Sequence, residues 1–220
     1  MEIIGHRGCA AQAPENTVSA VERAARYVDA VEIDVRRCGS GELVVFHDET
    51  VDRVTDGTGR VADLDWERLR ELEVMESGES IPRLESVLDA VPAGVGAQLE
   101  LKQTGIAGDV AAVARDCEVD VAVSSFLPDA LAAVHDLGWD VPTGYLFESD
   151  PRENVDVAVE LGCDAVHPHY DLCLWTDVVP VAREAGLRVV AWKAAKTPEE
   201  IAALRAAGVD GVTADRWDIV

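Results

Sequence analysis

Short apolar runs alternate with amphipathic segments along the whole chain of 220 residues. The apolar runs are rich in β-branched residues, which is typical of buried strands. We expect strands at residues 3–5, 30–35, 96–101, 119–124, 143–147, 165–167, 187–192 and 211–213. Between them, apolar residues recur at the spacing of one helical face. We expect helices at residues 16–27, 81–90, 108–116, 128–137, 154–161, 178–185 and 198–207.

Strands that alternate with helices in this way are typical of parallel βα units. Eight such units in one short chain predict a closed (β/α)8 TIM barrel, a single α/β domain over residues 1–220. An open doubly wound sheet is the alternative. No Gly-x-Gly-x-x-Gly motif follows the first strand, which weakens a dinucleotide-binding version of that alternative.

One interval, between the second strand and the helix at residues 81–90, breaks the alternation. Residues 42–46 indicate a returning strand, and we expect residues 49–80 to form a small insertion. Leu64, Leu69 and Leu72 have the spacing of a short amphipathic helix. Such a helix could cap the mouth of the barrel.

Two carboxylates and a histidine are concentrated around this second strand. Glu32 and Asp34 stand at i and i+2, so they share one face of the strand. The strand after the Cys38-Gly-Ser-Gly41 turn ends at His47. Buried like charges repel, so these carboxylates indicate a hard cation that prefers oxygen ligands. A solvated acidic edge beside an isolated histidine is the alternative.

Active sites of (β/α)8 barrels lie at the carboxyl ends of the strands. The polar and aromatic residues expected there are His6, Arg7, Glu32, Asp34, Glu100, Lys102, Ser124, Ser125, Phe126, Tyr145, Phe147, His167, Trp192, Lys193 and Asp215. Glu100 and Lys102 repeat the i, i+2 arrangement and add a carboxylate and a cation to one face. A buried structural ion pair is the alternative for these two residues. Three acids, two histidines and two cations are thus expected to converge.

Several motifs occur together in one order. They are His6-Arg7-Gly8, Pro14-Glu15-Asn16-Thr17, Glu32-x-Asp34-Val35, His47-Asp48, Asp52-Arg53-x-Thr55-x-Gly57-x-Gly59, Ile81-Pro82-x-Leu84 and Glu100-x-Lys102. In this order and spacing the chain resembles the glycerophosphodiester phosphodiesterase family. The chain departs from the family pattern at Trp192-Lys-Ala-Ala195, at Ala214 and Trp217, and at the turn of residues 38–41. These departures concern the part of the pocket that holds the leaving group.

The resemblance implies a barrel enzyme that uses a divalent metal to hydrolyse glycerophosphodiesters to glycerol phosphate and an alcohol. It implies that the substrate's own glycerol hydroxyl attacks first. By position it implies metal ligands at Glu32, Asp34 and Glu100, catalytic histidines at His6 and His47, and substrate-binding residues at Arg7, Lys102 and Trp192. Oxygen ligands favour Mg²⁺ or Ca²⁺, with Mn²⁺ as a further candidate, over zinc. Packing within the barrel is the alternative role for Trp192.

Three further histidines are expected to have no catalytic role. His167 and His169 form a His-x-His pair in a loop after a strand, and we expect them to be polar surface residues. His135 lies in an amphipathic helix, where we expect a structural role.

Charge narrows the range of partners. The chain has 42 acidic and 19 basic residues, a net charge of −23, and this charge would repel nucleic acid. Apolar residues make up 48% of the chain, so we expect a folded protein, and its acidic surface suggests adaptation to concentrated salt.

Localisation is predicted from the cysteines and the N-terminus. The five cysteines are scattered, without a Cys-x-x-Cys motif, which suits a reducing cytoplasm. The chain starts without a basic, apolar leader, and we expect neither secretion nor stable membrane insertion.

The partner expected from these observations is a small-molecule glycerophosphodiester. Two other functions remain open at this point. One is a phospholipase-like phosphodiesterase that acts on larger lipids, which would need an apolar rim. The other is a non-catalytic barrel that binds phosphorylated ligands, which the altered motif at residues 192–195 would allow.

Overall fold

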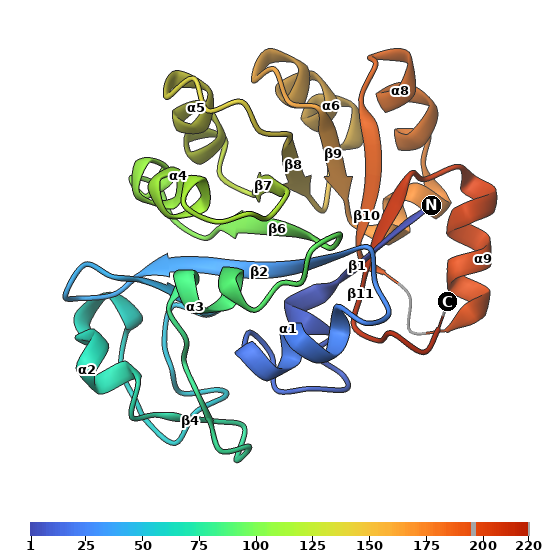
Figure 1. Ribbon diagram of the computed structural model, residues 1–220. Helices are drawn as coiled ribbons and strands as arrows, with labels where there is room; N and C mark the ends of the chain where they lie inside the picture. Colours follow the sequence, from blue (N-terminus) through green and yellow to red (C-terminus); the bar gives the residue numbers. More distant parts are fainter. Residues whose placement is uncertain (195–196, 220) are drawn as a thin grey trace.

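The computed structural model describes residues 1–194 and 197–219, so Ala195 of the altered motif lies outside the described residues. Eight parallel strands form a closed ring (Figure 1). They are β1 (Glu2–Gly5), β2 (Ala30–Arg37), β6 (Gly96–Leu101), β7 (Val121–Ser125), β8 (Thr143–Phe147), β9 (Ala165–Pro168), β10 (Arg188–Ala194) and β11 (Gly211–Ala214). Closure occurs at β1, where Ile4 pairs with Ala30 of β2 and with Thr213 of β11. The predicted TIM barrel is confirmed, and the open doubly wound sheet is wrong.

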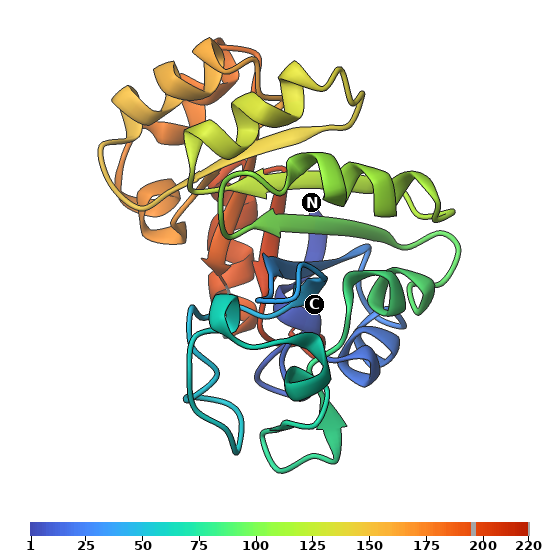
Figure 2. The same cartoon turned by 90° about the vertical axis from the view of Figure 1, so that its left-hand side faces the viewer.

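Helices surround the ring between the strands (Figures 1 and 2), seven of them near the positions that the sequence predicts and one, after β9, that it does not predict. They are α1 (Val18–Ala24), α3 (Leu84–Asp89), α4 (Ala107–Arg115), α5 (Pro128–Asp136), α6 (Pro151–Glu160), α7 (Tyr170–Trp175), α8 (Val178–Glu184) and α9 (Pro198–Ala207). Helix α1 begins two residues later than expected because the Thr17 hydroxyl accepts the Ala20 N–H and caps the helix. Helix α6 begins earlier because Pro151 occupies its first turn.

The main core lies between the ring and the helices. Ile33 and Val35 of β2 are fully buried in it together with Val21 of α1, Leu84 of α3 and Val110 of α4. Side chains alternate along a strand, so Glu32 and Asp34 point to the opposite side of β2, into the barrel. The apolar packing of the odd-numbered residues thereby places the carboxylates.

A second, smaller apolar cluster organises the segment between β2 and α3. Strand β3 (Leu43–Val45) pairs antiparallel with β2 outside the ring. It is followed by η2 (Val61–Asp63), α2 (Trp66–Leu69) and the hairpin of β4 (Glu73–Val74) and β5 (Glu79–Ser80). Of the helix expected around Leu64, Leu69 and Leu72, only α2 forms, and Leu64 lies between the end of η2 at Asp63 and the start of α2.

The apolar residues of this segment pack together apart from the main core. Leu69 and Leu72 are buried there with Val44, Val51 and Ile81. In both views the segment lies across the barrel from α5 and α6 (Figures 1 and 2). Its boundary at residues 49–80 remains a prediction. Among the described residues, every helix is too short or too polar to cross a bilayer.

Candidate active site

Three carboxylates meet inside the barrel. In the register of β2 and β6, Asp34 pairs with Glu100, and Glu32 stands two residues before Asp34. Glu32, Asp34 and Glu100 each offer a carboxylate oxygen, and these oxygens lie within 4.8 Å of one another. The side chains are buried, with 2%, 0% and 7% of each residue exposed. The structure thus brings together the three residues predicted as metal ligands.

Hydrogen bonds hold these carboxylates but leave two oxygens unsatisfied. Glu32 Oε2 accepts the Arg7 backbone N–H at 2.8 Å, and Asp34 Oδ2 accepts Asn16 Nδ2 at 2.8 Å. Glu32 Oε1 and Asp34 Oδ1 are buried and accept no hydrogen bond from a described residue. Buried anionic oxygens that accept no hydrogen bond are costly unless a cation satisfies them, and of the two only Asp34 Oδ1 has a charged partner among the described residues, Lys102 Nζ at 3.5 Å. The donor set therefore fits a divalent cation with oxygen ligands.

The pKa values of the three acids diverge. Burial and the negative charge of Asp34 raise the pKa of Glu32 and of Glu100. Burial acts in the same direction on Asp34, but Lys102 and Arg7 outweigh it and hold the pKa of Asp34 below its ordinary value. Asp34 is thus the most acidic of the three, and a bound cation would favour ionisation of the other two.

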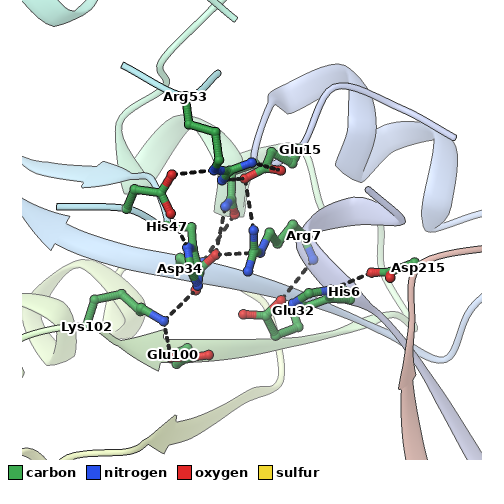
Figure 3. A network of polar contacts seen from close by, with 12 residues as sticks. His6, Arg7, Glu15, Glu32, Asp34, His47, Arg53, Glu100, Lys102 and Asp215 are labelled. Carbon is green, nitrogen blue, oxygen red and sulfur yellow. Dashed lines mark hydrogen bonds and ion pairs between the residues drawn. The ribbon is translucent and has the colours of Figure 1, made fainter. Parts of the chain in front are cut away.

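Two histidines flank the carboxylates, and each is held by an aspartate. His6 follows β1 directly, and its Nδ1 lies 2.6 Å from Asp215 Oδ1. His47 Nδ1 lies 2.5 Å from Asp48 Oδ1. In Figure 3, His6 lies beside Glu32 and His47 beside Asp34. With Nδ1 donating to aspartate, Nε2 of each ring is left to exchange a proton with a bound molecule.

The pKa values of the two histidines move in opposite directions. Burial disfavours the charged form of His6, but the hydrogen bond to Asp215 and the charge of Glu32 outweigh burial and raise its pKa. Burial lowers the pKa of His47, and the positive charges of Lys102 and Arg7 act in the same direction. His6 therefore holds a proton more readily than His47 does.

Two cations lie between the carboxylates. Lys102 Nζ is 2.5 Å from Glu100 Oε1 and 3.5 Å from Asp34 Oδ1. Arg7 Nε is 3.3 Å from Asp34 Oδ2. Both side chains are mostly buried, and both can bind the oxygens of a phosphate.

The backbone explains the glycine in the His6-Arg7-Gly8 motif. Arg7 and Gly8 both have positive φ, 51° and 74°. A Cβ on Gly8 would lie 2.8 Å from Ala20 Cβ, closer than side chains approach. Glycine at this position therefore lets the chain turn tightly against α1 and present His6 and Arg7 to the site.

Known proteins share this arrangement of fold and motifs. The model of the glycerophosphoryl diester phosphodiesterase family matches residues 6–219. The chain belongs to this family. A glycerophosphodiester phosphodiesterase of Caldanaerobacter subterraneus subsp. tengcongensis is 29% identical over 97% of this chain and 93% of that protein. The family identified from the motifs is therefore confirmed, together with its enzyme class, and the non-catalytic alternative is wrong.

Two solved structures of family members agree. A phosphodiesterase of Oleispira antarctica, in complex with the product sn-glycerol-3-phosphate, has a TM-score of 0.87 and 28% identity over 98% of this chain and 93% of its own. A glycerophosphodiester phosphodiesterase of Thermotoga maritima has a TM-score of 0.85 and 26% identity over 99% of this chain and 96% of its own.

Trp192 lies in the part of the site where the chain departs from the family pattern. Its indole N–H donates to the Phe147 carbonyl at 2.9 Å, and its ring meets those of Phe126 and His169 edge to face, each at 5.1 Å. Phe126 in turn lies 5.8 Å from Lys102 Nζ. The rings form a wall beside Lys102, and the roles of Trp192 and Lys102 in substrate binding remain predictions.

The three histidines expected to have no catalytic role lie in different surroundings. His167 is not at the surface: it is 4% exposed, because β9 continues to Pro168 and its ring packs against Gly144. Burial lowers the pKa of His167 to about 3. His169 is half-buried against Trp192. His135 Nε2 contacts the Thr143 hydroxyl at 3.2 Å, in agreement with a structural role.

Five polar residues around the site were not assigned roles from the sequence: Glu15, Asn16, Asp48, Arg53 and Asp215. Asn16 exchanges two hydrogen bonds with Asp34, one to its side chain and one from its backbone N–H. Four of the five lie in motifs of the family, and Asp215 follows the last strand. In the sequence, only membership of a motif or a position at a strand end pointed to these residues. The partners that they contact became visible only in the structure.

Proposed function

We propose that the protein hydrolyses glycerophosphodiesters to glycerol phosphate and an alcohol in a metal-dependent reaction, with His6 and His47 as general acid and base. The observation that carries the proposal is the arrangement of three buried carboxylates between two histidines, each held by an aspartate. The family membership and the product complex of the Oleispira antarctica relative support the same substrate class.

Glu32, Asp34 and Glu100 would hold the cation. When bound, a divalent cation supplies Lewis-acid stabilisation of the charge on a phosphoryl oxygen. Carboxylate oxygens without cysteine or histidine favour Mg²⁺, Ca²⁺ or Mn²⁺ over zinc. Arg7 and Lys102 add two positive charges next to the same carboxylates and would orient the non-bridging oxygens of the phosphodiester.

Displacement at phosphorus needs one proton removed from the entering oxygen and one delivered to the departing oxygen. The family resemblance implies that the entering oxygen is the glycerol hydroxyl of the substrate, which gives a cyclic phosphate that water opens later. His47, with its lowered pKa, suits the first-step base, and His6, with its raised pKa, suits the first-step acid. The two rings exchange roles when water opens the cyclic phosphate.

The test compares His6→Ala and His47→Ala on two substrates, a natural alkyl glycerophosphodiester and its p-nitrophenyl counterpart. Each variant should lose about 10²–10⁴-fold in kcat on the natural substrate, the usual contribution of a general acid or base. The p-nitrophenolate group leaves without protonation. His6→Ala should therefore recover most of its turnover on the aryl substrate, while His47→Ala should not.

His135→Ala is the matched control, because His135 lies outside the site and should leave kcat unchanged on both substrates. Equal losses of the two active-site variants on both substrates would contradict the assignment of acid and base. Near-normal turnover of either variant would contradict two-histidine catalysis itself.

A further inference from the structure

Arg53 extends from the segment between β3 and α3 toward the active site and contacts two carboxylates there. Its Nε lies 2.5 Å from Asp48 Oδ2. Its Nη1 and Nη2 donate to Glu15 Oε2 and Oε1 at 3.1 and 2.6 Å, a paired contact across both carboxylate oxygens. Figure 3 shows the guanidinium group of Arg53 next to Glu15, above His47 and Arg7.

Both carboxylates also contact a residue of the proposed chemistry. Asp48 Oδ1 lies 2.5 Å from His47 Nδ1. Glu15 Oε1 accepts Arg7 Nη1 at 3.0 Å. One guanidinium group therefore links the proposed general base to the phosphate-binding arginine, through one carboxylate on each side.

The carboxylates depend on Arg53 to stay ionised in a largely buried place. Only 9% of the Glu15 side chain is exposed, and burial alone would raise its pKa, but Arg53 and Arg7 reverse the effect and lower the pKa of Glu15. Hydrogen bonds to a charged fork are short and directional, so they restrict the carboxylate as well as stabilise it. Arg53 therefore keeps both carboxylates charged and in place.

The motif Asp52-Arg53-x-Thr55-x-Gly57-x-Gly59 builds the loop that carries Arg53. Asp52 Oδ2 accepts the Gly59 N–H at 3.1 Å. The Thr55 hydroxyl donates to the Val51 carbonyl at 2.8 Å and accepts the Gly57 N–H at 3.1 Å. The polar residues of the motif thus bond to the loop itself, and Arg53 is the member of the motif that contacts the site.

We propose that Arg53 is a positioning residue, which fixes His47 through Asp48 and Arg7 through Glu15. The inference rests on the proposed function, because it takes His47 as the base and Arg7 as a phosphate ligand. Nε, Nη1 and Nη2 of Arg53 all donate to carboxylates, so the side chain is engaged with protein acceptors rather than aimed at a substrate phosphate. The loop of residues 51–59 thereby contributes to catalysis without supplying a reacting group.

Loss of Arg53 should affect kcat and KM through different partners. Asp48 would lose its charged donor and hold His47 less firmly, and misplacement of a catalytic group by about 1 Å can cost about 100-fold in rate. We therefore expect Arg53→Ala to lower kcat by about 10–100-fold, as for other residues that orient a functional group. Glu15 would keep Arg7 as a partner, so we expect only a several-fold rise in KM.

The test measures Arg53→Ala in the wild-type background and in the His47→Ala background. If Arg53 acts on kcat through His47, its removal should lower kcat in the first background and leave kcat unchanged in the second. The rise in KM should persist in both. Arg53→Lys keeps the charge but cannot pair with both oxygens of Glu15, so its kcat should fall between those of the wild type and Arg53→Ala.

Arg60→Ala is the matched control. Arg60 belongs to the same segment and pairs with the exposed carboxylate of Glu49. Its kcat and KM should match the wild type. The proposal is overturned if Arg53→Ala keeps kcat within twofold of the wild type. It is also overturned if the removal of Arg53 lowers kcat by the same factor in the His47→Ala background as in the wild-type background. Near-normal turnover of His47→Ala alone would instead refute the proposed function.

Discussion

The variant Glu32→Gln tests two effects of a buried carboxylate separately: the stability that it costs the metal-free fold, and its contribution to cation binding. Burial and the charge of Asp34 raise the pKa of Glu32 from 4.5 to about 8. In the unfolded chain this glutamate is ionised at pH 7, whereas in the folded, metal-free protein it takes up a proton. Glu32 therefore destabilises the metal-free fold, increasingly as the pH rises from 4.5 to about 8, and not below pH 4.5.

The magnitude follows from the same shift. Between pH 4.5 and pH 7 each unit corresponds to about 1.36 kcal/mol, so Glu32 costs about 3 kcal/mol at pH 7. Glutamine has no such cost and keeps an oxygen that can accept the Arg7 N–H. At about 2–4 °C per kcal/mol for a chain of this size, Glu32→Gln should raise the melting temperature in EDTA at pH 7 by about 6–12 °C.

A divalent cation should reverse the order of the two melting temperatures, so that the wild type becomes more stable than Glu32→Gln. A cation present at 100 times its Kd stabilises the folded protein by about 2.7 kcal/mol. Glu32→Gln removes one of the three carboxylates that are expected to bind this cation. The assay is a thermal melt of both proteins at pH 5 and pH 7, in EDTA and in millimolar Mg²⁺, Ca²⁺ or Mn²⁺. The gain in EDTA should shrink at pH 5, and the cation should stabilise the wild type more than the variant.

The control is Glu67→Gln, which removes an exposed carboxylate in α2 and should change neither melt. If Glu32→Gln lowers the melting temperature in EDTA, the carboxylates are not mutually repelling in the metal-free fold. If both proteins respond equally to every cation, or if the EDTA-treated enzyme keeps full activity, Glu32 is not a ligand of a required metal.

Two further predictions concern the surface and the barrel. The net charge of −23 should make the melting temperature rise from dilute buffer to molar KCl, because salt screens the repulsion between acidic faces; a flat or falling melt would contradict adaptation to salt. Gly144→Ala should destabilise the fold by about 1–3 kcal/mol in denaturant melts, because the new Cβ would lie 2.3 Å from the buried His167 ring. Gly108→Ala, in the open first turn of α4, should be neutral or stabilising.

The alternation of strand and helix patterns predicted the ring, because the apolar residues that bury each strand stand next to one another in the sequence. It missed α7, a helix of six residues between β9 and α8. The cap of α7 is unusual: His169 Nδ1, rather than a hydroxyl or carboxylate, accepts the Asp171 N–H at 3.4 Å. A histidine at this position carries no helix-start signal in sequence, so the segment was read as a loop, and His167 as a surface residue.

The same distinction between local and distant contacts explains which parts of the site could be predicted. Glu32 and Asp34 share a face because strand geometry is periodic, and no other part of the chain is needed to see it. The contact of His6 with Asp215 spans 209 positions and exists only because β1 closes the ring against β11. Arg53 reaches Glu15 across 38 positions through a loop with little regular structure. Residues that supply ligands and protons could thus be found from strand pattern and motif, whereas the residues that hold them in place depend on ring closure and loop packing.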